Sequence, residues 1–186
     1  MTTTHQITEA DYERLVFSDP DRQWELYEGQ LREKPGMSWE HLDIVMQLGH
    51  LLKSQLDGRQ FRVFAEGRVR RPMATIFIPD VLVVPTALAP AFLGRPGRLA
   101  IIPDPLPLIV EVWSASTGDY DVDAKLPVYQ QRGDLEIWRI HPYEKTITTW
   151  RRQPDGTYAE TVYSEGAVTP LALPEVTIRL EDLFYF

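Results

Sequence analysis

Two acidic residues stand inside segments that are otherwise apolar. Asp80 lies within Ile-Phe-Ile-Pro-Asp-Val-Leu-Val-Val, and Glu111 lies within Pro-Leu-Ile-Val-Glu-Val-Trp. Such runs are typical of strands covered on both faces, where an unpaired carboxylate costs several kcal/mol. Buried acids are therefore paired, protonated or bound to a metal. One divalent cation with oxygen ligands would neutralise both acids. The alternative is that each acid pairs with an arginine or caps the end of a strand.

Lys125 is a third candidate, in a segment with helical spacing. It lies one turn from Val122 and Tyr129, so its side chain is expected to point partly towards the strand that carries Glu111. An ammonium group there could position or deprotonate a water molecule, or neutralise negative charge that develops on a phosphate. The alternative is a surface ion pair with Asp121, four residues earlier, which would contribute only a few tenths of a kcal/mol.

The helices that would position these residues are predicted from capping residues and apolar spacing. Thr8 and Asp11 form the pattern of a capping box, Ser38 is a helix N-cap, and Gly133 ends the last helix. The predicted helices span residues 8–17, 39–56 and 120–132. In the second helix, apolar residues recur at helical spacing and are expected to face the core; they are Leu42, Val45, Leu48, Leu51 and Leu52.

The strands alternate with these helices, so the fold class is mixed α/β. The predicted strands span residues 24–31, 61–71, 75–84, 108–113, 136–141, 146–152 and 158–163. The first contains a Glu-Gly pair that predicts a tight turn. Residues 85–107 hold six of the 15 prolines and are expected to form a long irregular connection. The apolar tail, residues 168–186, is expected either to dock on the core or to serve an oligomer contact.

Arginines gather in residues 59–71, where five arginines stand against one glutamate. Alternation predicts a single half-buried strand over residues 61–71, with Arg62, Arg68 and Arg70 on its outer face. These side chains could follow the phosphate backbone of a nucleic acid. A solvated edge strand, protected from aggregation by its charges, explains the same pattern equally well.

Seven short motifs, taken in their order and spacing, resemble the Uma-two family, bacterial proteins of the restriction-endonuclease-like superfamily with the PD-(D/E)xK core. The resemblance covers residues 8–184. The motifs are Trp24-Glu25-Leu26-Tyr27-Glu28-Gly29, Glu40-His41, Ile78-Pro79-Asp80, Val110-Glu111-Val112, Ser114-Ala115-Ser116-Thr117, Lys125-Leu126-Pro127-Val128-Tyr129 and Glu136-Ile137-Trp138-Arg139-Ile140-His141-Pro142.

This resemblance implies a restriction-endonuclease-like core, in which a mixed central sheet is flanked by helices and extended by β-hairpins, with residues 1–186 as a single domain. It implies that Asp80 and Glu111 bind Mg²⁺ or Mn²⁺ and that the backbone carbonyl of Val112 is a further ligand. Because Mg²⁺ keeps several waters when one or two carboxylates bind it, these ligands suffice.

The resemblance also assigns the remaining catalytic positions. The superfamily's usual lysine lies two residues after the second acid, where this chain has Trp113. In this family the lysine is thought to come from the following helix, and Lys125 matches that place. Glu25 and His41 match acidic and histidine positions that reach towards the same site. The alternatives are that His41 is a core or cap-region histidine and that Glu25 is a surface acid beside a turn.

Composition narrows the classes of protein that remain. The chain carries 19 basic against 27 acidic residues, a formal net charge of −8, which argues against a protein that coats nucleic acid by bulk electrostatics. It contains no cysteine, which excludes disulfides, zinc ribbons, thiol catalysis and iron–sulfur clusters. Neither a signal peptide nor a membrane-spanning segment is expected, because prolines and Asp80 interrupt the most apolar stretch. These features favour a cytoplasmic chain.

The sequence thus predicts a metal-dependent endonuclease that hydrolyses DNA phosphodiester bonds, with Asp80, Glu111 and Lys125 at its centre. The alternative is a nuclease-like fold that binds or assembles without catalysis; the negative charge and the missing lysine two residues after Glu111 favour it. A hydrolase that uses the same metal pocket on another substrate is a third hypothesis. A homodimer is expected, both from the apolar tail and because proteins with this fold often form dimers.

Overall fold

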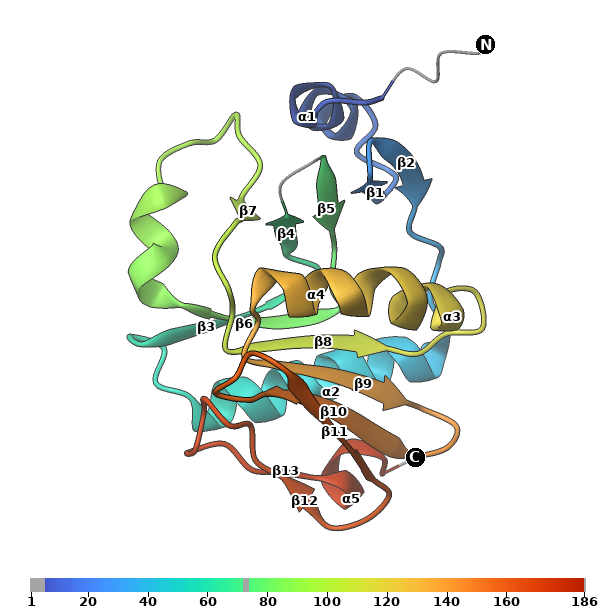
Figure 1. Ribbon diagram of the computed structural model, residues 1–186, viewed down its shortest axis with the longest axis vertical. Helices are drawn as coiled ribbons and strands as arrows, with labels where there is room; N and C mark the ends of the chain where they lie inside the picture. Colours follow the sequence, from blue (N-terminus) through green and yellow to red (C-terminus); the bar gives the residue numbers. More distant parts are fainter. Residues whose placement is uncertain (1–5, 72–73, 186) are drawn as a thin grey trace.

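The computed structural model describes residues 6–71 and 74–185 and arranges them around two main β-sheets (Figure 1). The larger sheet has six strands in the order β11-β10-β9-β8-β6-β3, in which β8 and β9 run parallel and the other neighbours antiparallel. Its strands are β3 (Phe61–Ala65), β6 (Val81–Pro85), β8 (Leu108–Val112), β9 (Glu136–His141), β10 (Thr146–Arg152) and β11 (Tyr158–Tyr163). The predicted mixed sheet is confirmed.

The smaller sheet has the strand order β2-β1-β5-β4-β7. Its strands are β1 (Trp24–Tyr27), β2 (Gln30–Glu33), β4 (Arg68–Arg71), β5 (Thr75–Phe77) and β7 (Ile101–Ile102), and a separate ladder joins β12 (Ala167–Val168) to β13 (Ile178–Arg179). The tight turn predicted from the Glu-Gly pair is confirmed between β1 and β2. Glu28 and Gly29 have φ of 50° and 78°, the left-handed conformation that such a turn requires at both central positions.

Helices cover both faces of the six-stranded sheet, with α2 on one face and the helical residues 118–132 on the other (Figure 1). The helices are α1 (Glu9–Ser18), α2 (Trp39–Gln55), the 3-10 helix η1 (Thr86–Ala91), α3 (Gly118–Tyr120), the π-helical turn η2 (Asp121–Lys125), α4 (Leu126–Arg132) and α5 (Leu180–Leu183). The predicted caps at Thr8, Ser38 and Gly133 all form. Within the described residues, no helix is both long and apolar enough to cross a membrane.

Alternation along β8 decides which layer receives Glu111. Leu108, Val110 and Val112 pack in the apolar cluster with α2, whereas Ile109 packs in the cluster with α4. Because successive side chains of a strand point to opposite faces, Glu111 lies on the α4 side, where Lys125 is. The continuous apolar run therefore reflects a strand covered on both faces, as the sequence predicts.

The C-terminal tail contributes to the cluster with α2, so the first of its two predicted roles is the one the structure shows. The tail residues in this cluster are Val168, Leu173, Val176, Ile178, Leu180, Leu183 and Phe184. The end of the predicted segment, residue 186, lies outside the described residues.

The predicted single strand over residues 61–71 is wrong, because the chain passes there from one sheet to the other. The segment divides into β3 of the larger sheet and β4 of the smaller. The break falls at Glu66, whose φ is 58°, and at Gly67. An added Cβ on Gly67 would lie 2.8 Å from a methyl carbon of Leu82, so a larger residue at this position would have to displace that side chain.

The predicted strand over residues 75–84 is wrong for the same reason, since it divides into β5 and β6. The two breaks lie side by side, because the backbone N–H of Glu66 donates to the carbonyl of Asp80 at 3.1 Å. Asp80 therefore lies at the junction of the two sheets rather than within a strand.

Candidate active site

Asp80 is buried at this junction and is held by three donors. Lys34 Nζ lies 2.7 Å from Oδ1, while His41 Nε2 and the backbone N–H of Val112 donate to Oδ2 at 3.1 and 2.7 Å. Burial disfavours the carboxylate, but the charge of Lys34 and the hydrogen bond from His41 hold the pKa of Asp80 well below its usual range. Asp80 is therefore ionised and accepts all three hydrogen bonds.

Lys125 is the centre of a second group of contacts at the same junction. Its Nζ lies 2.9 Å from Glu25 Oε1, 3.2 Å from Glu111 Oε1 and 3.4 Å from Asp121 Oδ1. Burial opposes its charge, yet the carboxylates of Glu111, Glu25, Asp121 and Asp80 raise the pKa of Lys125 well above its ordinary value. The side chain is only 2% exposed, so it is a buried ammonium group whose charge the surrounding carboxylates favour.

Glu111 and Glu25 connect this ammonium group to the two sheets. Tyr129 donates its hydroxyl to Glu111 Oε1 at 2.5 Å, and burial raises the pKa of Glu111 well above its ordinary value in spite of Lys125. Glu25 Oε1 accepts the backbone N–H of Ile78 at 2.8 Å, which fixes the chain two residues before Asp80. The five predicted catalytic residues therefore meet in one buried cluster.

The cluster contains more negative than positive charge. Four carboxylates surround two ammonium groups, all of them buried; the carboxylates belong to Glu25, Asp80, Glu111 and Asp121, and the ammonium groups to Lys34 and Lys125. When all six groups are ionised, an excess of two negative charges remains, and burying such an excess is costly. Oxygen donors with this excess suit a hard divalent cation such as Mg²⁺.

Unsatisfied polar atoms gather around the same cluster. In the described part of the chain, four buried side-chain atoms have no hydrogen-bond partner: His41 Nδ1, Tyr120 Oη, Asp121 Oδ1 and Arg139 Nε. Arg139 and Asp121 line one small cavity together with Glu111 and Tyr129. Buried polar atoms left without partners are rare in folded proteins, so these atoms set the surroundings of the cluster apart from an ordinary core.

The carboxylates do not form a ready-made metal cage. Among residues 6–71 and 74–185, no group of three or more histidine, aspartate or glutamate side chains is arranged to hold an ion. The reason is that lysine, histidine, tyrosine and backbone donors occupy their oxygens: Asp80 accepts from Lys34, and Glu111 from Lys125 and Tyr129. A cation would have to compete with these donors. The donor chemistry fits a metal, whereas in the structure protein donors bind these oxygens.

Three residues of the cluster are missing from the sequence prediction. Lys34 follows the β1–β2 hairpin in a polar segment with no recognisable pattern, and only the fold brings it to Asp80. Asp121 pairs with Lys125 as the alternative prediction stated, but the pair is buried, so the prediction that it lies at the surface is wrong. For Tyr129 the sequence does contain a pattern that indicates a place in the cluster, because residues 121, 125 and 129 recur every four positions on one helical face.

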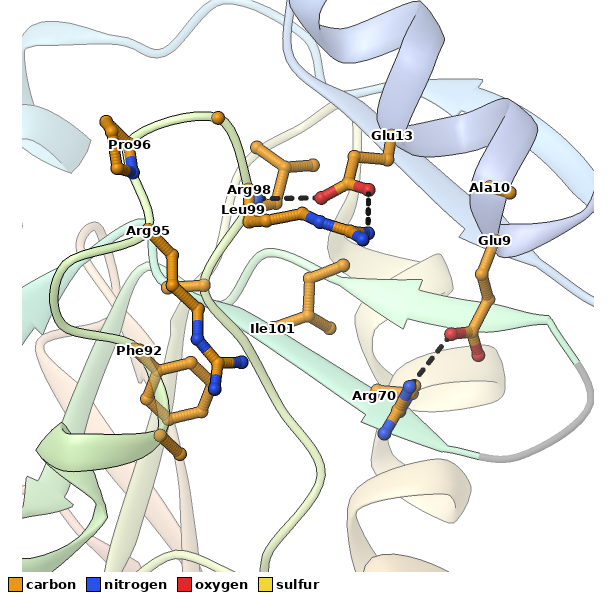
Figure 2. Close-up of a pocket in the computed structure, with 13 residues that line it drawn as sticks. Glu9, Ala10, Glu13, Arg70, Phe92, Arg95, Pro96, Arg98, Leu99 and Ile101 are labelled. Atoms are coloured by element: carbon orange, nitrogen blue, oxygen red, sulfur yellow. Dashed lines mark hydrogen bonds and ion pairs between the residues drawn. The ribbon is translucent and has the colours of Figure 1, made fainter.

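The three arginines predicted to share one strand face do not share a strand. Arg62 is on β3 and exposed, whereas Arg68 and Arg70 are on β4. Arg68 Nε donates to the hydroxyl of Tyr12 at 3.1 Å, and Arg70 pairs with Glu9 of α1 at 2.9 Å. Arg70 and Glu9 line a cavity of about 830 Å³ between α1 and residues 91–101, and Figure 2 shows their ion pair at the edge of this cavity. The prediction that these three arginines lie on one strand face is therefore wrong.

Comparisons with known proteins agree with this fold. The model of the Uma2 family, described as "Putative restriction endonuclease", matches residues 9–181. A crystal structure described as "a putative nuclease belonging to DUF820", from Anabaena variabilis, superposes with a TM-score of 0.74 at 22% identity, over 89% of this chain and 91% of that chain. At this identity the likeness concerns the fold. No match is found among curated proteins. The predicted restriction-endonuclease-like fold is confirmed.

Proposed function

The chain belongs to the Uma2 family, and from this premise we propose that it is a metal-dependent endonuclease that hydrolyses phosphodiester bonds in DNA. The family and the nuclease-like fold support a nuclease-like function. The observation that carries the finer proposal is the buried cluster of four carboxylates around two ammonium groups, which carries an excess of two negative charges when all six groups are ionised. A divalent cation would remove that excess.

In this proposal Asp80 and Glu111, with the backbone carbonyl of Val112, would hold Mg²⁺ or Mn²⁺. When bound, the ion would lower the pKa of a coordinated water and neutralise charge on the scissile phosphate. Lys125 contributes a fixed positive charge, since its surrounding carboxylates raise its pKa. It therefore orients a water or stabilises a phosphate oxygen by hydrogen bonding, rather than removing a proton. Glu25 positions Lys125, and His41 positions Asp80.

Calorimetry with Mn²⁺ and Mg²⁺ tests the metal site. Wild-type protein should bind the ion with measurable heat, and Asp80→Ala should lose that heat because one of two side-chain ligands is gone. Asp57→Ala, which removes a carboxylate from an exposed ion pair, is the matched control and should bind as wild type does. Equal heats for wild type and Asp80→Ala would rule out a metal site at Asp80. Cleavage of DNA should require the ion and disappear in the same variant.

Replacing Lys34 with methionine should increase the stabilisation that the metal provides. Lys34 is buried and its ammonium lies 2.7 Å from Asp80 Oδ1, so it competes with any cation for that oxygen. The variant should melt at a lower temperature than wild type without metal, and saturating Mg²⁺ should raise its melting temperature by more than it raises that of wild type. The double variant Lys34→Met/Asp80→Asn should show no metal shift. A smaller shift in Lys34→Met than in wild type would contradict the competition.

A nuclease-like fold without catalysis is the second candidate, and one observation favours it. The oxygens of Asp80 and Glu111 already accept hydrogen bonds from protein donors, and the described residues hold no ready-made metal cage. DNA affinity measured against salt concentration separates the two. A nuclease that contacts phosphates should bind DNA at low salt and lose affinity steeply as salt rises. Undetectable binding at low salt, together with intact protein and no cleavage, would favour the second candidate.

A further inference from the structure

The outer face of α2 exposes three large apolar side chains in a row. Trp39, Leu42 and Met46 are 82%, 53% and 70% exposed. The opposite face of the helix packs in the core through Ile44, Val45, Leu48 and Leu52. The prediction that Leu42 faces the core is wrong, because Leu42 is 53% exposed while Val45 and Leu48 continue the buried stripe. A surface patch of this kind marks an interaction site.

The spacing of the exposed residues is that of a helix-pairing seam. Positions 39, 42, 46, 49 and 53 follow the alternating steps of three and four residues that keep one stripe facing a partner helix. At Gly49 an added Cβ would meet no atom within 4 Å. The helix surface is therefore open at that point and can receive a bulky side chain from another helix. The seam ends at Lys53, which is exposed.

The charges beside the seam favour an antiparallel partner. The acidic Asp43 lies in the N-terminal half of α2, and the basic Lys53 lies in the C-terminal half. Two copies of α2 that pack antiparallel bring the acidic half of each against the basic half of the other, and their helix dipoles also oppose. Parallel packing would place like charges together. A face that complements itself in this way is what a two-fold dimer requires.

We propose that α2 is a homodimer interface, in which two copies of the helix pack antiparallel about a two-fold axis at Met46. In this arrangement Leu42 of one copy meets Gly49 and His50 of the other, and the Trp39 ring lies over the Lys53 side chain of the other copy. Seven apolar residues of the C-terminal tail are buried in the core, so they do not supply the contact. The inference does not depend on catalysis, since it rests on the outer face of α2 alone.

Cysteine cross-linking tests the pairing directly, because the chain contains no cysteine of its own. Met46→Cys faces its own copy across the axis and should form a covalent dimer on mild oxidation. Leu42→Cys alone should not, whereas an equal mixture of Leu42→Cys and His50→Cys should cross-link. Val162→Cys, on β11 at 59% exposure, is the control and should form no covalent dimer. Self-linking of Leu42→Cys with none in Met46→Cys would overturn the antiparallel arrangement.

Sedimentation equilibrium tests whether the dimer exists without cross-links. Wild-type protein should dimerise with a dissociation constant on the order of micromolar, and Leu42→Glu/Met46→Glu should weaken it at least about 100-fold. The control Val162→Glu/Leu171→Glu changes two side chains that are 59% and 60% exposed elsewhere and should dimerise as wild type does. Asp43→Lys should weaken the dimer, and Asp43→Lys/Lys53→Asp should restore it. A wild-type chain that stays monomeric at high concentration overturns the proposal and leaves the face to a different partner.

Discussion

Replacing Lys125 with methionine should lower the free energy of unfolding by about 3–5 kcal/mol at about pH 8, and by less than half of that at about pH 4. The methionine side chain keeps most of the volume but removes the ammonium group that contacts Glu25, Glu111 and Asp121. Three carboxylates then lack their cation in a site that water does not reach. Under the proposed function, DNA cleavage should fall to background in the same variant.

The pH dependence follows from the direction of the pKa shifts. Lys125 has a raised pKa when folded, so its contribution is complete below its unfolded pKa and is lost only at high pH. Glu111 and Asp121 also have raised folded pKa values, which burial causes. The folded protein therefore holds their protons more tightly than the unfolded chain, and stability falls as pH rises from their unfolded values. Without the Lys125 ammonium group, the folded pKa values of Glu111 and Asp121 rise further. The loss of unfolding free energy in Lys125→Met is therefore largest at the pH values at which these carboxylates ionise in wild type.

Urea unfolding of both proteins at the two pH values measures this difference. Arg59→Met is the matched control, because it also removes one cation from an ion pair, with Asp57 at 3.0 Å, but its side chain is 91% exposed. It should cost less than about 1 kcal/mol at either pH. Equal losses in Lys125→Met at both pH values would show that packing, and not the charge, accounts for the effect of Lys125.

The sequence could predict the candidate site where the energetic signal is local. Asp80 and Glu111 stand out because an acid within an apolar run must be compensated, whatever the fold around it. The alternation of side chains along β8 is also present in the structure, because Glu111 points to the layer that holds Lys125. Glu25 and His41 have no such local signal. They depend on the family resemblance, and the structure places both in contact with the predicted residues.

The sequence could not predict features that depend on contacts between distant segments. The alternating pattern of residues 61–71 continues through the break at Gly67, because β3 and β4 are both partly buried in separate sheets. The break lies at Glu66 and Gly67, where the chain passes to the second sheet beside Leu82, and this packing is invisible in the local pattern. Lys34 is a similar case: nothing around it in the sequence indicates burial, and only the sheet junction brings it to Asp80. Leu42 fits a helical apolar period, but that period does not say which face the core occupies.

Replacing Arg132 with methionine is the second change that should cost the fold about 3–5 kcal/mol at neutral pH. Arg132, in the last turn of α4, donates to the carboxylate of Asp134 at 3.0 Å and to the backbone carbonyls of Ile102 and Asp104 at 3.2 and 2.6 Å. Asp134 in turn accepts the backbone N–H of Leu106 at 2.7 Å. The pair therefore attaches the proline-rich connection to α4, and its removal leaves both a buried charge and free carbonyls.

The charge of Asp134 makes the stability loss in Arg132→Met depend on pH. Removing that charge should restore part of the lost stability. Burial raises the pKa of Asp134 to about 6 even beside Arg132, so stability falls as pH rises from the unfolded value of about 4 through that folded value. Without Arg132 the folded pKa must rise further, and the loss in Arg132→Met should grow between about pH 5 and pH 8. Adding Asp134→Asn removes the charge but keeps an oxygen for Leu106, so the double variant should regain part of the lost stability in urea unfolding and lose its pH dependence. If the double variant is as unstable as Arg132→Met, the carbonyl contacts of Arg132, rather than its charge, hold the connection in place.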